Sequence, residues 1–447
     1  MARRGTAAEE LVRALDGVLG AARFPWRLRA WDGSEAGPPG APTITLRSPV
    51  AVRRMLWAPG ELGLVRAYVA GDLDIDGDVL EALGALSTVG RLTTEAAFPR
   101  PTAGTWLQLA RTATALGVVG PPPPPPPEEF SRPRHRRVHS RGRDAAAIAH
   151  HYDVSNDFYA LVLGPTLVYS CAVWTDEGTG LDGAQEAKLD LVCRKLGLRP
   201  GMRLLDVGCG WGSLALHAAQ RFDVDVVGIT LSAQQAELAR RRIATAGLND
   251  RVTVRVQDYR EVADGPFDAI ASIGMAEHVG LAQLPLYAAR LHVLLRPGGR
   301  LLNHAIARGP AAGPDRPDPR SFLTRYVFPD GELQPLATHV RILEEAGFEV
   351  ADVEALRRHY ALTCRAWVNN LERRWDEAVR LSSPGRARVW RLYLAGSALA
   401  FEGHRVGVNQ VLAIKPGSPG HDRLPLTRPD WSRRAVEQAQ EPSDGAA

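Results

Sequence analysis

Hydrophobic and polar positions alternate differently on the two sides of a seven-proline run, Pro121 to Pro127. After it, short apolar runs alternate with stretches of helical periodicity, a rhythm typical of βαβ units and a parallel sheet. Strands are predicted at Arg203–Val207, Asp225–Ile229, Val252–Val256, Phe267–Ser272, Arg300–Ala305 and Gly407–Ile414, and helices at Gly212–Arg221, Ser232–Ala246, Leu284–Leu295 and along Thr363–Ala400. The pattern predicts an α/β fold with a doubly wound, mostly parallel sheet.

The chain before the prolines has a different pattern, with strand-like segments TITLRS and LDIDGD around a helix-like segment near Val50 to Leu56. We therefore expect a smaller α+β N-terminal domain over 1–118 and a Pro-rich, basic linker over 119–143. A catalytic domain is expected over 144–416 and a polar, disordered tail over 417–447.

Composition narrows the class of protein. The net charge is only +4 over 447 residues, so no nucleic-acid partner is expected. The four cysteines form no CxxC pair, and no metal site is predicted. No run approaches the ~18 apolar residues of a membrane span, and the N-terminus lacks a signal-peptide pattern. We expect a cytoplasmic protein.

The strongest local motif is LLDVGCGWG, an apolar strand that ends at Asp206 and a turn that carries Gly208, Gly210 and Gly212. Glycine permits positive φ and lets a ligand approach the backbone, so a strand, glycine turn and helix in this order indicate a nucleotide site. A second strand end, SIGMAEHVG, places Glu277 and His278 beside that site.

The next two strand ends indicate which nucleotide is bound. A dinucleotide site has an acidic residue at the end of its second strand, but Thr230 stands there, with Gln235 available for ribose hydrogen bonds. After the third strand, Asp258 is placed to accept from an adenine amino group and Tyr259 to stack on the ring. These residues favour S-adenosylmethionine over NAD.

Together these segments resemble the cyclopropane fatty acid synthases and the related mycolic acid cyclopropane synthases. The resemblance rests on residues His151 to Trp174, Ala184 to Gly201, the glycine turn, GITLSAQQ, SIGMAEHVG, LLNHAI, RYVFPDGEL, HYALTCRAW and, upstream, Ala58 to Val79. It implies a class I methyltransferase fold, Rossmann-like, with a helical lid or insertion and a smaller N-terminal domain that interacts with lipid.

The resemblance also implies the reaction and the residues that perform it. A methyl(ene) group passes from S-adenosylmethionine to the cis double bond of an unsaturated phospholipid acyl chain, and a bound bicarbonate removes a proton so that a cyclopropane ring closes. The implied bicarbonate ligands are Cys171, Glu277, His304, Ile306 through its backbone, and Tyr360. The implied cofactor contacts are Tyr169, Ser170, Gly208, Gly210, Thr230, Gln235 and Tyr259.

Several alternatives stay open at this point. Cys171, His304 and Tyr360 could each be an ordinary core residue. Loss of a different proton would give a methylene-branched chain, a precursor that a partner reductase would convert to a methyl branch. The other candidates are methylation of a small metabolite and a non-catalytic protein that binds the membrane surface. The chain departs from the family at Ser397, where cysteine is frequent, and at Ala276, where a bulky residue is usual.

The expected partners follow from the substrate. They are membrane phospholipid acyl chains, reached by peripheral contact with the inner face of the membrane, with a homodimer as an option. Trp26 and Trp31 lie among arginines in an interfacial composition, and the basic stretch Arg132 to Arg143 could pair with anionic headgroups. A solvated linker is the alternative for that stretch.

Overall fold

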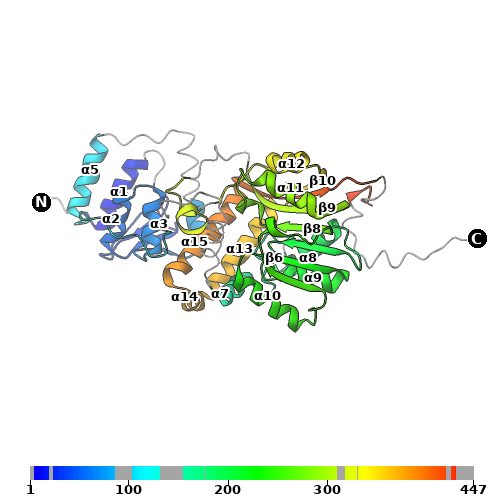
Figure 1. Ribbon diagram of the computed structural model, residues 1–447. Helices are drawn as coiled ribbons and strands as arrows, with labels where there is room; N and C mark the ends of the chain where they lie inside the picture. Colours follow the sequence, from blue (N-terminus) through cyan, green and yellow to red (C-terminus); the bar gives the residue numbers. More distant parts are fainter. Residues whose placement is uncertain are drawn as a thin grey trace, which may run out of the picture. The chain divides into compact units, whose positions relative to one another are not determined.

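The computed structural model describes residues 5–19, 24–85, 103–130, 155–176, 178–309, 318–329, 331–418 and 424–428. The chain divides into two compact units. The first comprises Met1–His135, Arg316–Pro329 and Cys364–Ala400, and the second comprises Arg136–Asp315, Asp330–Thr363 and Phe401–Ala447. Figure 1 labels those helices and strands for which the view has room.

The second unit is built on a seven-stranded sheet with the order β10-β11-β9-β8-β5-β6-β7. Its strands are β5 (Arg203–Val207), β6 (Asp225–Thr230), β7 (Val252–Val256), β8 (Phe267–Ile273), β9 (Leu295–Arg308), β10 (Glu349–Ala355) and β11 (Val406–Ile414). β5 to β9 pair in parallel, whereas β11 runs antiparallel to both β9 and β10. The predicted mostly parallel sheet is confirmed.

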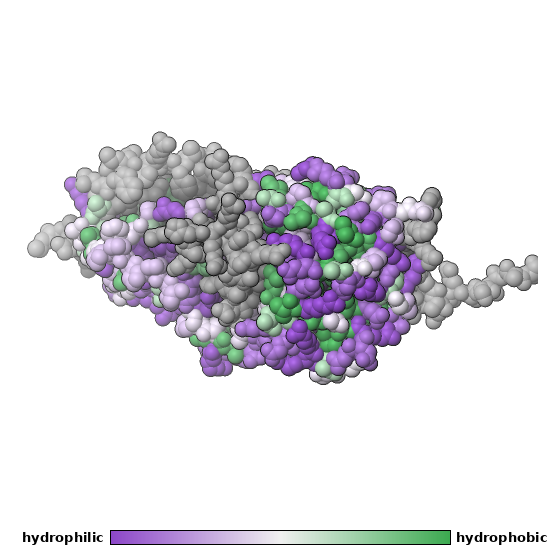
Figure 2. Space-filling view, viewed as in Figure 1, coloured by the Kyte–Doolittle hydropathy of each residue, from purple (hydrophilic) through white to green (hydrophobic). Residues whose placement is uncertain are grey.

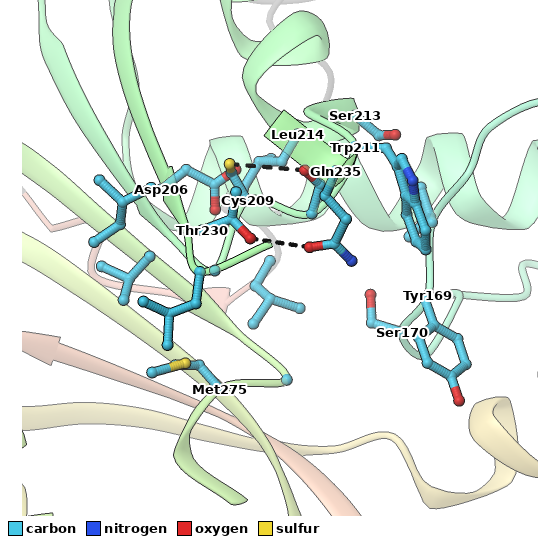
Figure 3. A pocket seen from close by; sticks show the side chains of 18 of the residues that line it. Tyr169, Ser170, Asp206, Cys209, Trp211, Ser213, Leu214, Thr230, Gln235 and Met275 are labelled. Carbon is cyan, nitrogen blue, oxygen red and sulfur yellow. Dashed lines mark hydrogen bonds between the residues drawn. The ribbon is translucent and has the colours of Figure 1, made fainter. Parts of the chain in front are cut away.

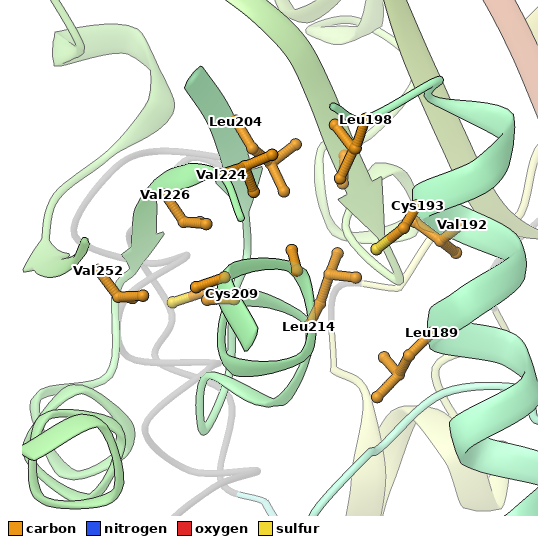
Figure 4. Packing of buried hydrophobic residues seen from close by; sticks show 14 of the residues in the cluster. Leu189, Val192, Cys193, Leu198, Leu204, Cys209, Leu214, Val224, Val226 and Val252 are labelled. Atoms are coloured by element: carbon orange, nitrogen blue, oxygen red, sulfur yellow. The ribbon is translucent and has the colours of Figure 1, made fainter. Parts of the chain in front are cut away.

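Helices cover both faces of this sheet (Figure 1). They are α7 (Asn156–Leu163), α8 (Leu181–Lys195), α9 (Ser213–Phe222), α10 (Ala233–Thr245), α11 (Leu284–Leu294) and α12 (Leu336–Glu345), with short turns η1 (Tyr259–Glu261) and η2 (Ala276–His278). One core joins α8, α9 and α10 to the sheet, where Leu189 and Leu214 pack with Leu204 and Val226 (Figure 4). A second core joins α11 and α12 to the opposite face. This layering is the doubly wound arrangement expected from the sequence.

Local signals in the sequence account for several boundaries. The Ser232 hydroxyl accepts from the Gln235 N–H and caps α10, close to the predicted start of this helix. The helical stretch Thr363–Ala400 instead forms parts of three helices, α13 (Arg357–Arg373), α14 (Trp375–Leu381) and α15 (Pro384–Glu402). The break between α14 and α15 has a local cause. Pro384 lacks the N–H that a continuous helix needs, and proline fits the first position of a helix.

The first unit contains a small sheet with the order β2-β1-β3-β4. Its elements are α1 (Ala7–Leu19), β1 (Arg27–Arg29), β2 (Glu35–Ala36), β3 (Thr43–Leu46), α2 (Pro49–Trp57), α3 (Glu61–Val69), β4 (Leu73–Asp76), α5 (Ala103–Ala115) and the π-helical turn η3 (Leu323–Val327), with α14 and most of α13 and α15. Prolines 121–127 carry no helix or strand. The predicted α+β character of this region matches the structure.

Trp26 does not fit the membrane-interface composition suggested by the sequence. It is only 8% exposed, its indole N–H donates to the Ala82 carbonyl at 2.8 Å, and Phe24 packs edge-on against it. Trp31 is partly buried. Trp26 directly precedes β1, and the alternation that buries Leu28 and exposes Arg29 in this strand extends back to it, so Trp26 points inward. The basic stretch Arg132 to Arg143 lies outside the described residues.

The compact units differ from the contiguous domains expected from the sequence. Phe322, Tyr326 and Val327 pack in one apolar cluster with Leu62 and Val65, which assigns a late segment to the first unit. The expected disordered tail also differs in part, because Arg428 donates to Asp352 and to the Val353 carbonyl. Both differences arise from packing between residues far apart in sequence.

The surface of the second unit shows no broad apolar face in the view of Figure 2, where hydrophobic residues form small groups among hydrophilic ones. Among the described residues, no helix combines the length and apolar character needed to cross a bilayer.

A buried carboxylate ties the chain after the prolines to the rest of the first unit. Glu129 accepts from Arg66 Nε and Nη2, each at 2.7 Å, from Arg325 Nε at 2.9 Å, and from the Tyr326 hydroxyl at 3.1 Å. Burial by itself would raise the pKa of Glu129, but hydrogen bonds from Arg66 and Arg325 outweigh it and hold that pKa below its ordinary value. The carboxylate is therefore charged in the folded protein.

We predict that Glu129→Gln lowers the free energy of unfolding by about 3 kcal/mol, because two partly buried guanidinium groups lose their counter-charge. A urea titration at neutral pH measures the loss. Since the folded pKa is depressed, the wild-type advantage exists at higher pH and is lost as pH falls below about 4.3, the pKa of an unfolded glutamate.

Glu35→Gln is the matched control, since Glu35 also pairs with two arginines, Arg27 and Arg29, but at the surface. Exposed pairs contribute little, so its urea midpoint should stay near that of the wild type. Equal shifts for both variants would contradict the stabilising role assigned to Glu129.

Candidate active site

The glycine turn follows β5 and holds its shape through the neighbouring strand. The N–H groups of Gly208 and Cys209 both donate to the Ile229 carbonyl at 2.9 Å. Gly208 has φ +82° and Gly210 has φ +54°, conformations that L side chains rarely adopt. A Cβ on Gly210 would meet nothing within 4 Å, so the backbone there borders open space. A ligand can therefore approach the main chain closely.

This open space is a pocket at the carboxyl ends of the parallel strands, where doubly wound sheets bind ligands. Tyr169 and Ser170 lie across it from Asp206 and Thr230 (Figure 3). The predicted cofactor residues that line it are Tyr169, Ser170, Asp206, Gly208, Gly210, Thr230, Gln235, Asp258 and Tyr259. These residues therefore border one and the same pocket.

Gly212 is the exception among the predicted cofactor residues, because it does not line the pocket. It has φ +78° at the start of α9, and a Cβ there would lie 3.2 Å from Ala239 Cβ. The structure thus gives Gly212 a packing role between α9 and α10.

The polar groups at the ends of β6 and β7 are arranged by short hydrogen bonds. The Thr230 hydroxyl donates to Gln235 Oε1 at 2.9 Å, which orients the amide at the pocket wall (Figure 3). The Asp258 carboxylate accepts from Arg260 Nε at 2.8 Å, and the Arg260 guanidinium lies over the Tyr259 ring. Tyr259 also packs edge-on against Tyr287, with ring centroids 5.4 Å apart. Both strand ends are held rigid, as a nucleoside pocket requires.

Some residues of the pocket wall were not predicted from the sequence, among them Lys188, Trp211 and Gln257, whereas His278 lies there as the sequence indicates. Lys188 was missed because it lies in the helix α8, where the pattern of apolar residues does not indicate that a lysine is buried. Trp211 is held by its indole N–H, which donates to Asn156 Oδ1 at 2.8 Å. The sequence could have indicated Trp211 as a pocket residue, because it stands between Gly210 and Gly212 in the glycine turn.

A second group of polar residues gathers around β9, and most of its side chains are buried. The Ile306 N–H donates to Glu277 Oε1 at 3.2 Å. His304 lies opposite Gln410 in the β9–β11 ladder, with Gln410 Nε2 3.3 Å from His304 Nδ1. The amide nitrogen is a donor, so Nδ1 accepts and a neutral ring carries its proton on Nε2. Within the described residues, Glu277 Oε2 and His304 Nε2 have no hydrogen-bond partner.

Cys171 and Tyr360 join the same group through Leu356. Cys171 Sγ lies 3.6 Å from the Leu356 carbonyl, which also accepts from the Tyr360 N–H at 3.1 Å. The Leu356 N–H donates to the Val408 carbonyl, and Val408 is the register partner of Ile306. Tyr360 stacks on Phe401 with centroids 4.5 Å apart. All five residues predicted for the anion cluster are thus linked through neighbouring backbone groups.

Burial governs the charges in this cluster. It raises the pKa of Glu277 to about 7 and lowers the pKa of His304 to about 3, so His304 is neutral at physiological pH. Glu277 can then give or take a proton near neutrality. Strongly perturbed groups of this kind concentrate at functional sites.

The cluster adjoins the pocket without forming part of its lining. Met275 and His278 line the pocket on either side of Glu277 in sequence, and Ser170 precedes Cys171. Ile273, a lining residue at the end of β8, is the register partner of His304. A nucleotide pocket and a dry, charge-bearing cluster therefore lie side by side at the same edge of the sheet.

Comparisons with known proteins agree with this geometry. A family model described as mycolic acid cyclopropane synthetase matches residues 139–411. A probable fatty acid methyltransferase of Mycobacterium tuberculosis is 44% identical over 92% of this chain and 95% of its own length. The Escherichia coli cyclopropane-fatty-acyl-phospholipid synthase is 39% identical over 59% of this chain and 66% of its own.

A solved structure is similar as well. Mycolic acid cyclopropane synthase CmaA1, in complex with SAH (S-adenosylhomocysteine) and CTAB, is 36% identical and covers 61% of this chain and 98% of its own, with a TM-score of 0.57. The glycine turn, the Thr230–Gln235 pair and the rigid Tyr259 wall suit an adenosyl ligand of that kind.

We predict that Gly210→Val weakens S-adenosylhomocysteine binding by at least about tenfold, because a β-branched residue is strained at φ +54° and its side chain enters the pocket. Isothermal titration calorimetry measures the affinity. Gly247→Val is the control, since Gly247 has φ +68° and equally open surroundings but does not line the pocket. It should lower the melting temperature and leave affinity intact; a similar loss of affinity in both would refute the placement.

Proposed function

Because the chain belongs to the mycolic acid cyclopropane synthetase family, we propose that it converts the cis double bond of unsaturated phospholipid acyl chains into a cyclopropane ring. It is an S-adenosylmethionine-dependent methyltransferase of the cyclopropane synthase type. One observation carries the proposal: the nucleotide pocket at the glycine turn adjoins the buried cluster of Glu277 and His304. The two meet where Ile273, which lines the pocket, pairs with His304 in the sheet.

The residues of the pocket would hold S-adenosylmethionine, which supplies an electrophilic methyl group when bound. Gly208 and Gly210 permit close approach to the backbone, and Gln235 and Tyr259 border the space for the nucleoside. Because the pocket wall is rigid, it can hold a reactive group in a fixed direction, which lowers the entropic part of the barrier.

The residues of the cluster suit a small anion that both donates and accepts hydrogen bonds. His304 Nε2–H is an unpartnered donor and Glu277 Oε2 an unpartnered acceptor within the described part of the chain. Bicarbonate has an oxygen for the first and a hydroxyl for the second, and it supplies a base when bound. The Ile306 N–H holds Glu277 in place, and Tyr360 offers an aromatic face to developing positive charge.

The substrate class sets the remaining requirements. An alkene is a weak nucleophile, so water must be excluded, and the burial of Cys171, Glu277 and His304 supports a dry site. Acyl chains reside in a bilayer, so the protein must contact the membrane surface to reach them. We assign that contact to the basic stretch Arg132 to Arg143, which pairs with anionic headgroups.

One alternative product deserves a test of its own. Loss of a different proton would leave a methylene branch rather than a ring. Two observations favour it. Relatives that match almost the whole chain are named probable fatty acid methyltransferases, and Ala276 stands where the resemblance leads us to expect a bulky residue. Ala276 is buried next to Glu277 in sequence, so its side chain belongs to the interior close to the cluster.

Proton NMR of lipids from an expressing host separates the two products. We expect upfield cyclopropane ring protons, whereas vinylidene protons would establish the methylene-branched product and overturn ring closure. If both signals are absent from lipid that contains cis double bonds, methyl transfer to acyl chains is rejected.

We predict that Glu277→Gln keeps S-adenosylhomocysteine affinity and lowers turnover by at least about 100-fold, because the amide removes both the charge and an acceptor from the cluster. Methyl incorporation from labelled S-adenosylmethionine into lipid measures turnover. The control is Glu237→Gln, a surface glutamate on α10 that pairs with Arg241. Normal turnover in Glu277→Gln would remove Glu277 from the mechanism.

A further inference from the structure

Lys188 is a buried cation whose bonding capacity is mostly unused. It lies on α8, is 1% exposed, and lines the nucleotide pocket. Its ammonium donates to the Ser170 hydroxyl at 3.0 Å. An ammonium has three N–H donors, and no other acceptor within the described residues is in reach. Burying an ammonium whose N–H donors lack acceptors costs free energy of folding. Such an arrangement therefore indicates that a ligand supplies the missing acceptors.

The protein's own carboxylates do not complete the site. Within the described part of the chain, no carboxylate oxygen lies within ion-pair distance of Lys188. Asp206 is near enough to interact electrostatically, but its Oδ2 has no hydrogen-bond partner among the described residues. Burial lowers the pKa of Lys188 to about 8 and raises that of Asp206 to about 7. Lys188 is therefore mostly charged at neutral pH, and its neighbour is partly neutral.

A second lysine on the same helix shows the contrast. Lys195 lies two turns further along α8 and is equally buried, but it forms an ion pair with Glu354 and lies 3.7 Å from Asp352. Lys195 does not line the pocket. The helix thus carries one buried lysine satisfied by protein carboxylates and one directed at the ligand site.

The groups that face Lys188 come from several elements. Asp206 is on β5 and Cys193 on α8 itself, while Cys171 and His304 belong to the anion cluster. Lys188 also helps to keep His304 neutral, together with Lys195. Its ammonium therefore acts on both the nucleotide pocket and the cluster around β9.

We propose that Lys188 is the recognition residue for a carboxylate-type oxyanion at the wall shared by these two sites, with the Ser170 hydroxyl as its positioned partner. The inference rests on the proposed function. Two molecules have this chemistry: the amino-acid carboxylate of the methyl donor, and a carbonate ion. The donor carboxylate is favoured, because Lys188 and Ser170 line the nucleotide pocket and Cys171, Glu277 and His304 do not.

Calorimetry with two ligands tests the proposal on the full chain. S-adenosylhomocysteine carries the carboxylate, and 5′-methylthioadenosine has the same nucleoside without it. We expect Lys188→Met to weaken the first by about 10- to 100-fold, the range for a charged hydrogen bond, and to leave the second unchanged. If S-adenosylhomocysteine affinity is unchanged but half-maximal turnover needs about tenfold more bicarbonate, the oxyanion is carbonate and the recognition role stands.

Lys195→Met is the matched control, expected to lower stability without changing either affinity. If Lys188→Met fails to fold, Ser170→Ala removes only the hydroxyl partner and should give a smaller loss that is again confined to S-adenosylhomocysteine. Equal weakening of both ligands, or no change in either affinity and in the bicarbonate response, would overturn the proposal. Lipid NMR of the wild type is independent of this result, so failure here is distinguishable from failure of the proposed function.

Discussion

The ladder that holds β9 between β8 and β11 is the constraint on which the site depends. On one side Ile273 pairs with His304, and on the other Val408 pairs with Ile306. Successive strand residues alternate between faces, so a slip of one residue would turn His304 to the opposite face and break the bond from Ile306 to Glu277. The register therefore determines both the nucleotide pocket edge and the cluster beside it.

The two sites differ in how their polar groups are satisfied. In the pocket wall, Thr230, Gln235 and Asp258 are bonded to other side chains, which makes the wall rigid before any ligand arrives. Around β9 and at Lys188, by contrast, buried donors and acceptors keep unused capacity. Buried donors and acceptors without hydrogen-bond partners destabilise the folded state. The large apolar cores on the two faces of the sheet offset this loss of stability.

Sequence patterns predicted six of the seven strands of the central sheet, because these strands are short, mostly apolar segments flanked by turns. β10 was missed, since Glu349–Ala355 contains acidic residues and is half-buried at the sheet edge. The long helical stretch before β11 was predicted as continuous, although Pro384 marks a break. The interpretation of Trp26 was wrong because local composition does not reveal which side chains the rest of the fold covers.

The sequence by itself determined the fold class, the glycine turn and the identity of the residues that gather at the carboxyl ends of the strands, because these depend on local periodicity and backbone conformation. Only the tertiary structure decided which of them meet. Gly212 packs against a helix instead of bordering the pocket, and Lys188 enters it from a helix with no motif of its own. Burial, hydrogen-bond partners and shifted pKa values arise from contacts between distant segments, and no local pattern encodes them.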